Sequence, residues 1–182
     1  MSRPHNARAA DNRRASTRNS SRAGIWFLYS GLVYRALIRR RVVANFARLS
    51  AGDYKAVVAQ LAPDVHHVFG GDSALGGERH SREAVERWFD RLSRLCPQID
   101  FEVGRVISSG PPWDIWGAAE WIGHVTPAAG EPYVNVGAHV FRIRNGRISY
   151  FHAYEDSQKV ARACEQMAAL GLEEAAAAPI ID

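Results

Sequence analysis

The chain has 182 residues, of which 47% are hydrophobic and 23% are charged. This size and balance fit a single globular domain, and they exclude fibrous, fully disordered and membrane-embedded proteins. The formal net charge of +4 is concentrated at one end, since residues 1–22 hold six arginines and one aspartate whereas the rest has 17 basic and 18 acidic residues. The composition therefore gives no reason to expect a nucleic-acid partner beyond weak binding by the basic end.

Residues 1–22 are rich in Ser, Asn, Ala and Arg without apolar periodicity, which predicts a disordered basic tail. The apolar run that follows, residues 24–34, is shorter than the ~20 residues needed to span a bilayer, and no small-residue cleavage site comes after it. We therefore expect neither membrane attachment nor export. Cys96 and Cys164 lie in no disulfide or metal-binding pattern, which favours a cytoplasmic location.

Helical periodicity dominates the first half of the chain. Three helices are expected there, with apolar stripes formed by Ile38, Val42, Phe46 and Leu49; by Val57, Val58 and Leu61; and by Ala84, Val85, Trp88, Phe89 and Leu92. Gly52 ends the first helix, and Asp53 caps the second, which ends at Pro63. Ser81 caps the third helix. Residues 39–41, all arginine, are assigned to the solvated face of the first helix.

The spacing of apolar residues changes to two in the second half, which is typical of β-strands. After a first strand at residues 64–70, four further strands are predicted at residues 99–108, 115–124, 133–144 and 147–154. Asn145 and Gly146 favour a tight hairpin turn between the last two. A final helix is expected to begin at a capping Asp156 and to end at Gly171. Helices followed by an antiparallel meander predict an α+β fold with helices on one face of a curved sheet.

The order of these elements resembles the SnoaL-like branch of the nuclear transport factor 2 (NTF2) superfamily. Four segments carry the resemblance: ARLSAGDY (47–54), GGERHSREAVERWFDRL (76–92), HVFRIRNGRI (139–148) and FHAYEDSQKV (151–160). It implies a cone-shaped, curved antiparallel sheet with the N-terminal helices on its concave face and a pocket between them. The domain is placed at residues 23–174, followed by a C-terminal tail at residues 175–182. The superfamily includes ketosteroid isomerases, polyketide cyclases, limonene-epoxide hydrolases and scytalone dehydratases.

Side chains alternate between the faces of a strand, and this decides which polar groups can share the pocket. If Phe69 faces inward, as the resemblance implies, His67 does too and His66 faces outward. The candidate catalytic residues are His67 and His139, as general acid and base, because a neutral imidazole can serve in either role near neutral pH. The predicted ligand-binding residues around them are Phe69, Trp88, Asn135, Phe141, Phe151 and Glu155. An apolar chamber should lower the pKa of both histidines.

The family chemistries can be compared with this chain residue by residue. The carboxylate base, tyrosine and protonated aspartate of a ketosteroid isomerase fall on Phe69, Asn45 and His139, so the base is missing. The aspartate of an epoxide hydrolase falls on Ala153. A dehydratase-like pair of histidines is retained, and Glu155 is a candidate for the acid or base of a polyketide cyclase.

Three hypotheses remain open. The chain is a cofactor-free isomerase, cyclase or dehydratase that moves protons on a small apolar ring compound; it is a ligand-binding domain without chemistry, in which the inward histidines are satisfied by buried hydrogen bonds; or it is a dimerisation module. Val134, Val136 and Val140 share the outward face, so a homodimer is expected. Neither cofactor nor metal is expected, because no HxH, HExxH or paired CxxC motif occurs. The face taken by Glu120 stays undetermined.

Overall fold

The computed structural model describes residues 33–182, and the predicted basic tail lies outside them. Residues 38–182 form one compact unit. A first helix is described over residues 33–50. The other helices are α2 (Tyr54–Val58), α3 (Arg82–Leu95), α4 (Ser157–Ala169) and the 3₁₀ turn η1 (Glu173–Ala176). The strands are β1 (Leu61–Phe69), β2 (Gly77–Arg79), β3 (Gln98–Ser109), β4 (Asp114–Thr126), β5 (Tyr133–Arg144) and β6 (Arg147–Glu155).

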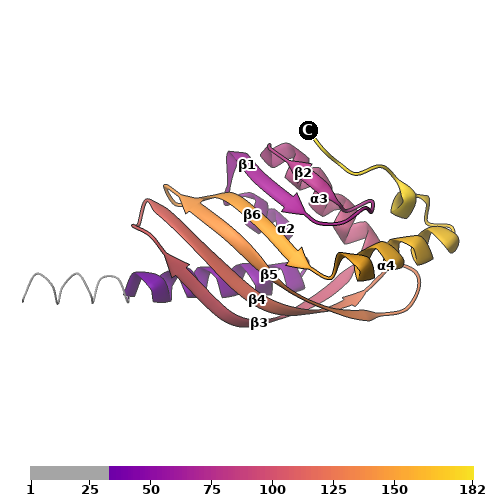
Figure 1. Ribbon diagram of the computed structural model, residues 1–182, viewed down its shortest axis with the longest axis horizontal. Coiled ribbons are helices and arrows are strands. Elements are labelled where there is room, and N and C mark those ends of the chain that lie inside the picture. Colours follow the sequence, from indigo (N-terminus) through magenta and orange to yellow (C-terminus); the bar gives the residue numbers. More distant parts are fainter. Residues whose placement is uncertain (1–32) are drawn as a thin grey trace, which may run out of the picture. The chain divides into compact units, whose positions relative to one another are not determined.

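The strands form one six-stranded sheet in the order β2-β1-β6-β5-β4-β3 (Figure 1). The α+β class is confirmed, but the sheet is mixed rather than wholly antiparallel, because β1 runs parallel to β6. The chain leaves β1, passes through β2 and α3, and enters the sheet again at its far edge with β3. The antiparallel meander from β3 then returns to β1, so that β6 arrives there in the same direction as β1.

The sheet bends through local irregularities in its ladders. The pairing of β3 with β4 shifts between Val103 and Val106, and that of β5 with β6 shifts at residues 142–143; such bulges increase twist and bend a strand. On the inner face, glycines make room for aromatic rings. A Cβ atom at Gly137 would lie 2.7 Å from Cζ2 of Trp121, so only glycine fits beneath that ring.

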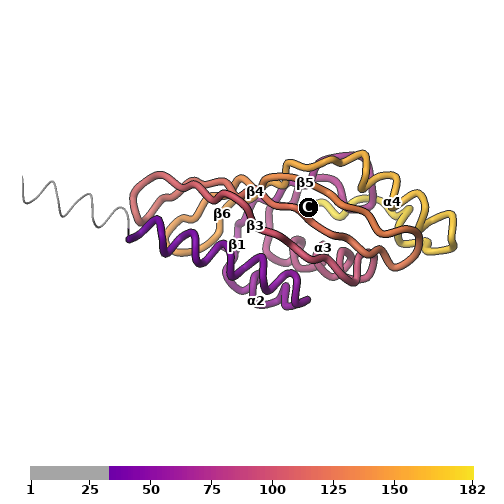
Figure 2. Tube along the Cα trace, turned by 90° about the horizontal axis from the view of Figure 1, so that it is seen from below, coloured from indigo at the N-terminus to yellow at the C-terminus, as the bar shows by residue number. Residues whose placement is uncertain are grey.

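The concave face of the sheet is covered by residues 38–50 of the first helix together with α2 and α3, which Figure 2 shows on one side of the strands. Their caps are those predicted from the sequence. The Asp53 carboxylate accepts a hydrogen bond from the backbone N–H of Ala56 at 3.3 Å, and the Ser81 hydroxyl accepts one from Ala84 at 3.2 Å. The apolar stripe of α3 is buried, with Trp88 only 3% exposed.

Two predictions about these helices are wrong. Leu61 belongs to β1 and pairs with Ile148 of β6, rather than extending α2. Pro63 favours extended backbone in the residue before it, and the strand therefore begins earlier than predicted. The second concerns Arg41, whose Nε donates to Oε1 of Gln60 and whose Nη1 donates to the Gly146 carbonyl, both at 2.9 Å. It links the first helix to the end of the sheet instead of standing in solvent.

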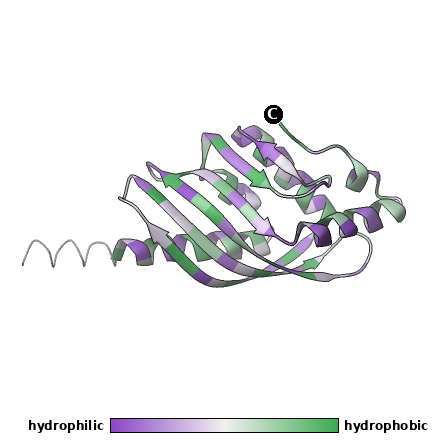
Figure 3. Ribbon diagram, in the orientation of Figure 1, coloured by the Kyte–Doolittle hydropathy of each residue, from purple (hydrophilic) through white to green (hydrophobic). Residues whose placement is uncertain are grey.

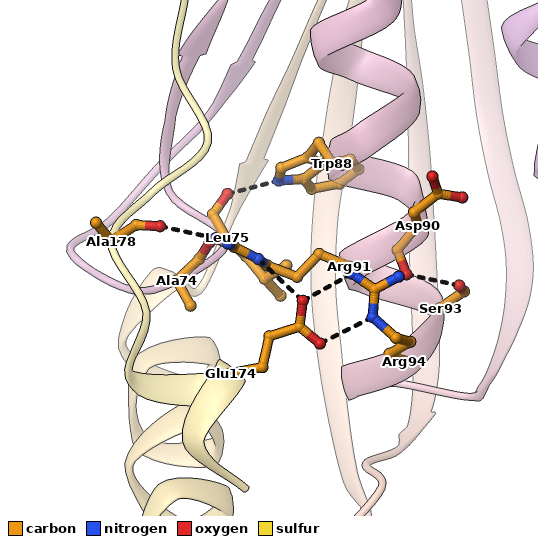
Figure 4. Close-up of polar contacts among 9 residues, drawn as sticks. All are labelled: Ala74, Leu75, Trp88, Asp90, Arg91, Ser93, Arg94, Glu174 and Ala178. Carbon is orange, nitrogen blue, oxygen red and sulfur yellow. Dashed lines mark hydrogen bonds and ion pairs between the residues drawn. The ribbon is translucent and has the colours of Figure 1, made fainter.

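The C-terminal residues beyond α4 pack on α3. Asp156 caps α4 by accepting from the backbone N–H of Lys159 at 3.3 Å. In η1, Glu174 accepts hydrogen bonds from Arg94 at 2.7 and 2.8 Å, and the Ala178 carbonyl accepts one from Arg91 at 2.8 Å (Figure 4). The segment predicted as a tail therefore makes specific contacts with the domain.

In the part of the chain that the structure describes, no helix has both the length and the apolar character of a membrane span.

Candidate functional site

A cavity of about 190 Å³ lies between the concave face of the sheet and the helices that cover it. Its lining includes the four aromatic residues that the sequence placed there: Phe69, Trp88, Phe141 and Phe151. Strand alternation, visible as bands of opposite hydropathy along the strands in Figure 3, directs the three phenylalanines inward, and Trp88 faces them from the buried stripe of α3. The cavity is thus mainly apolar, although polar side chains such as Asn135 and His67 also line it.

His67 projects into this cavity from β1 and is 1% exposed. Its ring stacks on Phe151 with centroids 4.2 Å apart and meets the edge of Trp88 at 4.5 Å. Neither ring nitrogen has a hydrogen-bond partner among the described residues. Burial lowers the pKa of His67 well below its usual value, and the charges of Arg79 and His139 lower it further. The imidazole is therefore neutral at physiological pH.

His139 lines the same cavity from β5. Its ring packs edge-on against Phe46 at 5.3 Å and lies 5.6 Å from the ring of Trp121. Its Nδ1 is buried and has no hydrogen-bond partner in the described part of the chain. Burial, with a smaller effect from His152, lowers the pKa of His139 to about 4. Both pKa shifts have the direction expected from the sequence.

Glu155, at the end of β6, also lines the cavity. Its Oε2 accepts a hydrogen bond from Nδ2 of Asn135 at 3.1 Å, and its Oε1 is buried without a partner among the described residues. Burial, followed by the charge of Asp156, raises the pKa of Glu155 to about 8. At neutral pH the carboxyl group is therefore mostly protonated and can donate a proton.

Asn135 fixes the orientation of Glu155. Its Oδ1 accepts hydrogen bonds from the backbone N–H groups of Val136 at 3.0 Å and Asp156 at 3.3 Å, which leaves Nδ2 to donate to the carboxyl group. The side chain of Asn135 is 2% exposed. Its hydrogen bonds connect β5, which carries His139, with the end of β6, which carries Glu155. These bonds hold the Asn135 amide in one orientation, so that it positions the Glu155 carboxyl group.

The pairing register places the three ionisable groups in successive rows of the sheet. Glu155 lies opposite Gly137 of β5, His139 lies opposite Ala153 of β6, and His67 lies opposite Phe151 of β6. Rows on one face are two residues, or roughly 7 Å, apart along a strand. His139 and His67 flank β6 from opposite sides, and a molecule of one or two rings is large enough to reach from one row to the next.

Further polar groups of this cavity were not predicted from the sequence, among them Trp121 and Tyr133. Trp121 is only 5% exposed, and its indole Nε1 is buried in the cavity without a hydrogen-bond partner among the described residues. Since Trp121 faces inward, Glu120 faces outward, which settles its orientation. Tyr133 hydrogen-bonds to Cys96, and burial raises the pKa of both, that of Cys96 to about 12. Tyr133 shares strand parity with Asn135, and that signal was available in the sequence.

Most of the residues that line this cavity lie within the part of the chain that matches a known family. The family model for the SnoaL-like domain matches residues 42–151, more than half of the chain. The chain belongs to the SnoaL-like family. The SnoaL-like match contains His67 and His139 and ends before Glu155. No curated protein matches the sequence.

Solved structures show the same fold at low sequence identity. An NTF2-like protein of unknown function from Burkholderia pseudomallei is 23% identical, with a TM-score of 0.61 over 69% of this chain and 95% of its own. TerC, crystallised with polyporic acid, is 16% identical, with a TM-score of 0.56 over 68% and 95%. A protein provisionally assigned as a polyketide cyclase from Xanthomonas campestris is 21% identical, with a TM-score of 0.51 over 69% and 95%. These likenesses establish the fold and leave the activity open.

Proposed function

We propose that the cavity binds a small, largely apolar ring compound, and that His67, His139 and Glu155 move protons on it without a cofactor, as in an isomerase, cyclase or dehydratase. One observation carries the proposal: all three side chains have buried polar atoms that lack a partner among the described residues. Buried polar groups are normally hydrogen-bonded, and each exception needs an explanation. A bound substrate that supplies the missing partners is such an explanation.

The protonation states assign the roles. His139, with its pKa lowered to about 4, is neutral at physiological pH and can accept a proton. Glu155, with its pKa raised to about 8, is mostly protonated and can donate one. Groups whose surroundings move their pKa values apart in this way are suited to act as base and acid on one substrate. His67 is a second neutral imidazole, one row from His139 and two rows from Glu155, where it can accept a proton or a hydrogen bond.

The size and lining of the cavity support a small ring compound as the ligand. An apolar cavity of about 150 Å³ engineered in another protein is large enough to bind benzene. The cavity of about 190 Å³ found here suits a ligand of one or two rings. TerC, which shares the fold, was crystallised with polyporic acid. The aromatic wall would stack on such rings, while the ionisable groups would contact their polar substituents.

Proton exchange in D₂O tests this function. One- and two-ring ketones and phenols are screened by the rise they cause in melting temperature, and each ligand is then incubated with protein in D₂O and analysed by mass spectrometry. We expect deuterium incorporation or product with the wild-type protein. His139→Gln and Glu155→Gln should slow it by about 10²–10⁴-fold, the usual contribution of general acid-base catalysis, while binding is retained. His124→Gln, on the outer face of β4, is the matched control and should have no effect.

Other outcomes separate the alternatives. Binding without exchange or product would favour a ligand-binding domain, in which His139→Gln weakens affinity by about 0.5–1.5 kcal/mol through loss of one hydrogen bond. Exchange that persists in both cavity variants would contradict the assigned roles. So would a rate that stays constant below pH 4 and above pH 8, where His139 gains a proton and Glu155 loses one. No stabilisation by any compound of this class would contradict the proposed ligand.

We also propose that a second copy of the chain covers the outer face of the sheet. Ile122 pairs with Val136 across β4 and β5, and both are exposed, as is Val134 on the same strand. Acidic Glu102 lies beside this strip on β3 and the Lys159 ammonium lies on its other side, donating to the Val134 carbonyl. An apolar strip flanked by opposite charges can be self-complementary about a twofold axis.

Sedimentation tests this assembly. The wild-type protein is expected to sediment as a dimer at micromolar concentration, and Val136→Lys as a monomer, since a charge would be buried in the interface. Leu170→Lys is the control, because Leu170 is an exposed apolar residue in the turn after α4. A monomeric wild-type protein, or a dimeric Val136→Lys variant, would contradict the proposed interface.

A further inference from the structure

A cluster of metal-ligand side chains lies at the β1–β2 edge of the sheet, away from the cavity. It consists of His66 of β1, Glu78 of β2 and His80, which follows β2, and the ligand atoms of all three lie within 4.8 Å of one another. Nε2 of His66 is 2.8 Å from Oε2 of Glu78, and the rings of His66 and His80 stack with centroids 4.5 Å apart. The cluster therefore combines two imidazoles with one carboxylate.

The strand register brings these residues together. β1 and β2 are antiparallel, with His67 opposite Arg79 and Val68 opposite Glu78, so His66 and His80 occupy the next pair. Alternation places the ligand side chains on the face opposite to that of His67. Arg79 points to the other side, where it is fully buried and donates to backbone carbonyls. Its positive charge is thus directed away from the cluster.

The donor set suits a divalent transition ion. Histidine nitrogen and a glutamate oxygen are ligands of Zn²⁺, at about 2.0–2.2 Å, and imidazole also suits Cu²⁺ and Ni²⁺. The His66 and Glu78 side chains are 37% and 56% exposed, so an ion can reach them and small rotations can bring the ligand atoms to coordination distance. Three protein ligands leave further coordination positions for water.

Neighbouring groups hold the two histidines in place. The Tyr150 ring lies edge-on to His66 at 5.3 Å. At the other end, an Asp182 carboxylate oxygen accepts a hydrogen bond from the backbone N–H of His80 at 2.6 Å, which brings a second negative charge close to the cluster. The ring contact restricts the orientation of the His66 imidazole, and the carboxylate of Asp182 adds a negative charge that attracts a cation.

We propose that His66, Glu78 and His80 bind one divalent transition-metal ion of the Zn²⁺ class, which fastens the short edge strand β2 to β1. The site is independent of the proposed cavity chemistry, because its ligands point away from the cavity. Motif spacing did not reveal it, since His66 is separated from Glu78 and His80 by the loop between the strands. Its expected effect is to stabilise the sheet edge and the start of α3, which Ser81 caps immediately after His80.

Calorimetric titration with ZnCl₂ tests the site, using the full-length chain without a polyhistidine tag. The wild-type protein should bind one equivalent of Zn²⁺ at this site. His80→Gln and Glu78→Gln should each weaken binding by at least about tenfold, since even loss of an outer contact costs metal sites 10–100-fold in affinity. His124→Gln is the matched control, because the His124–Glu102 pair has a similar separation of 2.9 Å and similar exposure, but no third ligand is grouped with it among the described residues.

Thermal unfolding gives a second readout. A ligand that binds only the folded state stabilises it. Zn²⁺ should therefore raise the melting temperature of the wild-type protein and of His124→Gln. It should leave the melting temperatures of His80→Gln and Glu78→Gln unchanged. The proposal is overturned if the wild-type protein shows no heat of binding up to millimolar Zn²⁺. It is equally overturned if both cluster variants bind as tightly as the wild-type protein, since the ion would then lie elsewhere.

Discussion

On the cavity face of the sheet, His67 is buried, and neither of its ring nitrogens has a hydrogen-bond partner among the described residues. His139 is half-buried, and its Nδ1 is buried without a partner there. On the outer face, His66 and His124 lie 2.8 and 2.9 Å from glutamate oxygens and are partly exposed. His66 and His67 are neighbours in the sequence, so residue type and local sequence do not distinguish them. The difference comes from what packs on each face, because an aromatic wall removes water from one imidazole while solvent and a carboxylate surround the other.

Carboxyl groups follow the same division. Glu155 faces the cavity, where burial raises its pKa to about 8, whereas Glu78 and Glu102 face outward and pair with histidines. At neutral pH the inner face therefore holds His67 and His139 unprotonated and Glu155 mostly protonated, as a base and an acid must be before proton transfer. The outer face holds partly exposed His–Glu pairs, which can bind ions or contribute to an interface.

Of the substitutions on the two faces, Glu155→Gln should cause the largest pH-dependent change in the free energy of unfolding. The pKa of Glu155 is raised from 4.5 to about 8, so its contribution to stability is full below pH 4.5 and is lost as the pH rises to about 8. Gln keeps the neutral state, so the variant should gain up to about 5 kcal/mol relative to the wild-type protein across this range. Urea unfolding at several pH values measures it. A constant difference would show that Glu155 is not desolvated in the folded protein.

Trp88→Ala should destabilise the cavity face by about 3–5 kcal/mol, the usual cost of removing a large buried aromatic side chain. Trp88 is 3% exposed, packs against His67 and Phe69, and donates to the Leu75 carbonyl at 2.7 Å (Figure 4). Trp113→Ala is the control, because Trp113 is 65% exposed. Its loss should cost less than about 1 kcal/mol. Equal free energies of unfolding for the two variants would contradict the buried position of Trp88.

His139→Gln should change the acid limb of the stability curve. The pKa of His139 is lowered from 6.5 to about 4, so the stability contributed by its neutral form is present above pH 6.5 and is lost as the pH falls to about 4. The variant cannot take up this proton, so it should gain up to about 3 kcal/mol relative to the wild-type protein over that range. NMR titration of the wild-type imidazole provides a direct check, and a midpoint near 6.5 would contradict the burial of this ring.

Glu102→Gln should have the smallest effect. The carboxylate of Glu102 is 69% exposed in its pair with His124, and exposed ion pairs contribute about 0.2–1 kcal/mol. Salt screens such pairs, so the difference from the wild-type protein should shrink as ionic strength rises. Unfolding in low and high salt measures it. A larger loss that is independent of salt would contradict the exposed position of the Glu102–His124 pair.

Local signals in the sequence predicted much of this fold. The caps at Asp53, Ser81 and Asp156 depend on residues within one helical turn, and all three are present. The Asn145–Gly146 turn has φ values of 48° and 79°, as a tight hairpin turn requires. Strand alternation placed His67, His139 and Glu155 on the cavity face. Each of these features is decided by a few neighbouring residues, which is why the sequence alone was sufficient.

Only the tertiary structure decided the rest. The sequence could not show that β6 runs parallel to β1, because that depends on the path of all the chain between them. It could not bring His66 next to Glu78 and His80, since the pairing of β2 with β1 carries no spacing motif. It also could not show that Glu155 is left with an unpartnered oxygen, because desolvation is the combined effect of every group packed around a site. The sequence by itself determined which residues of a strand share a face, because side chains alternate. Tertiary packing decided which face encloses the cavity and which groups surround each side chain there.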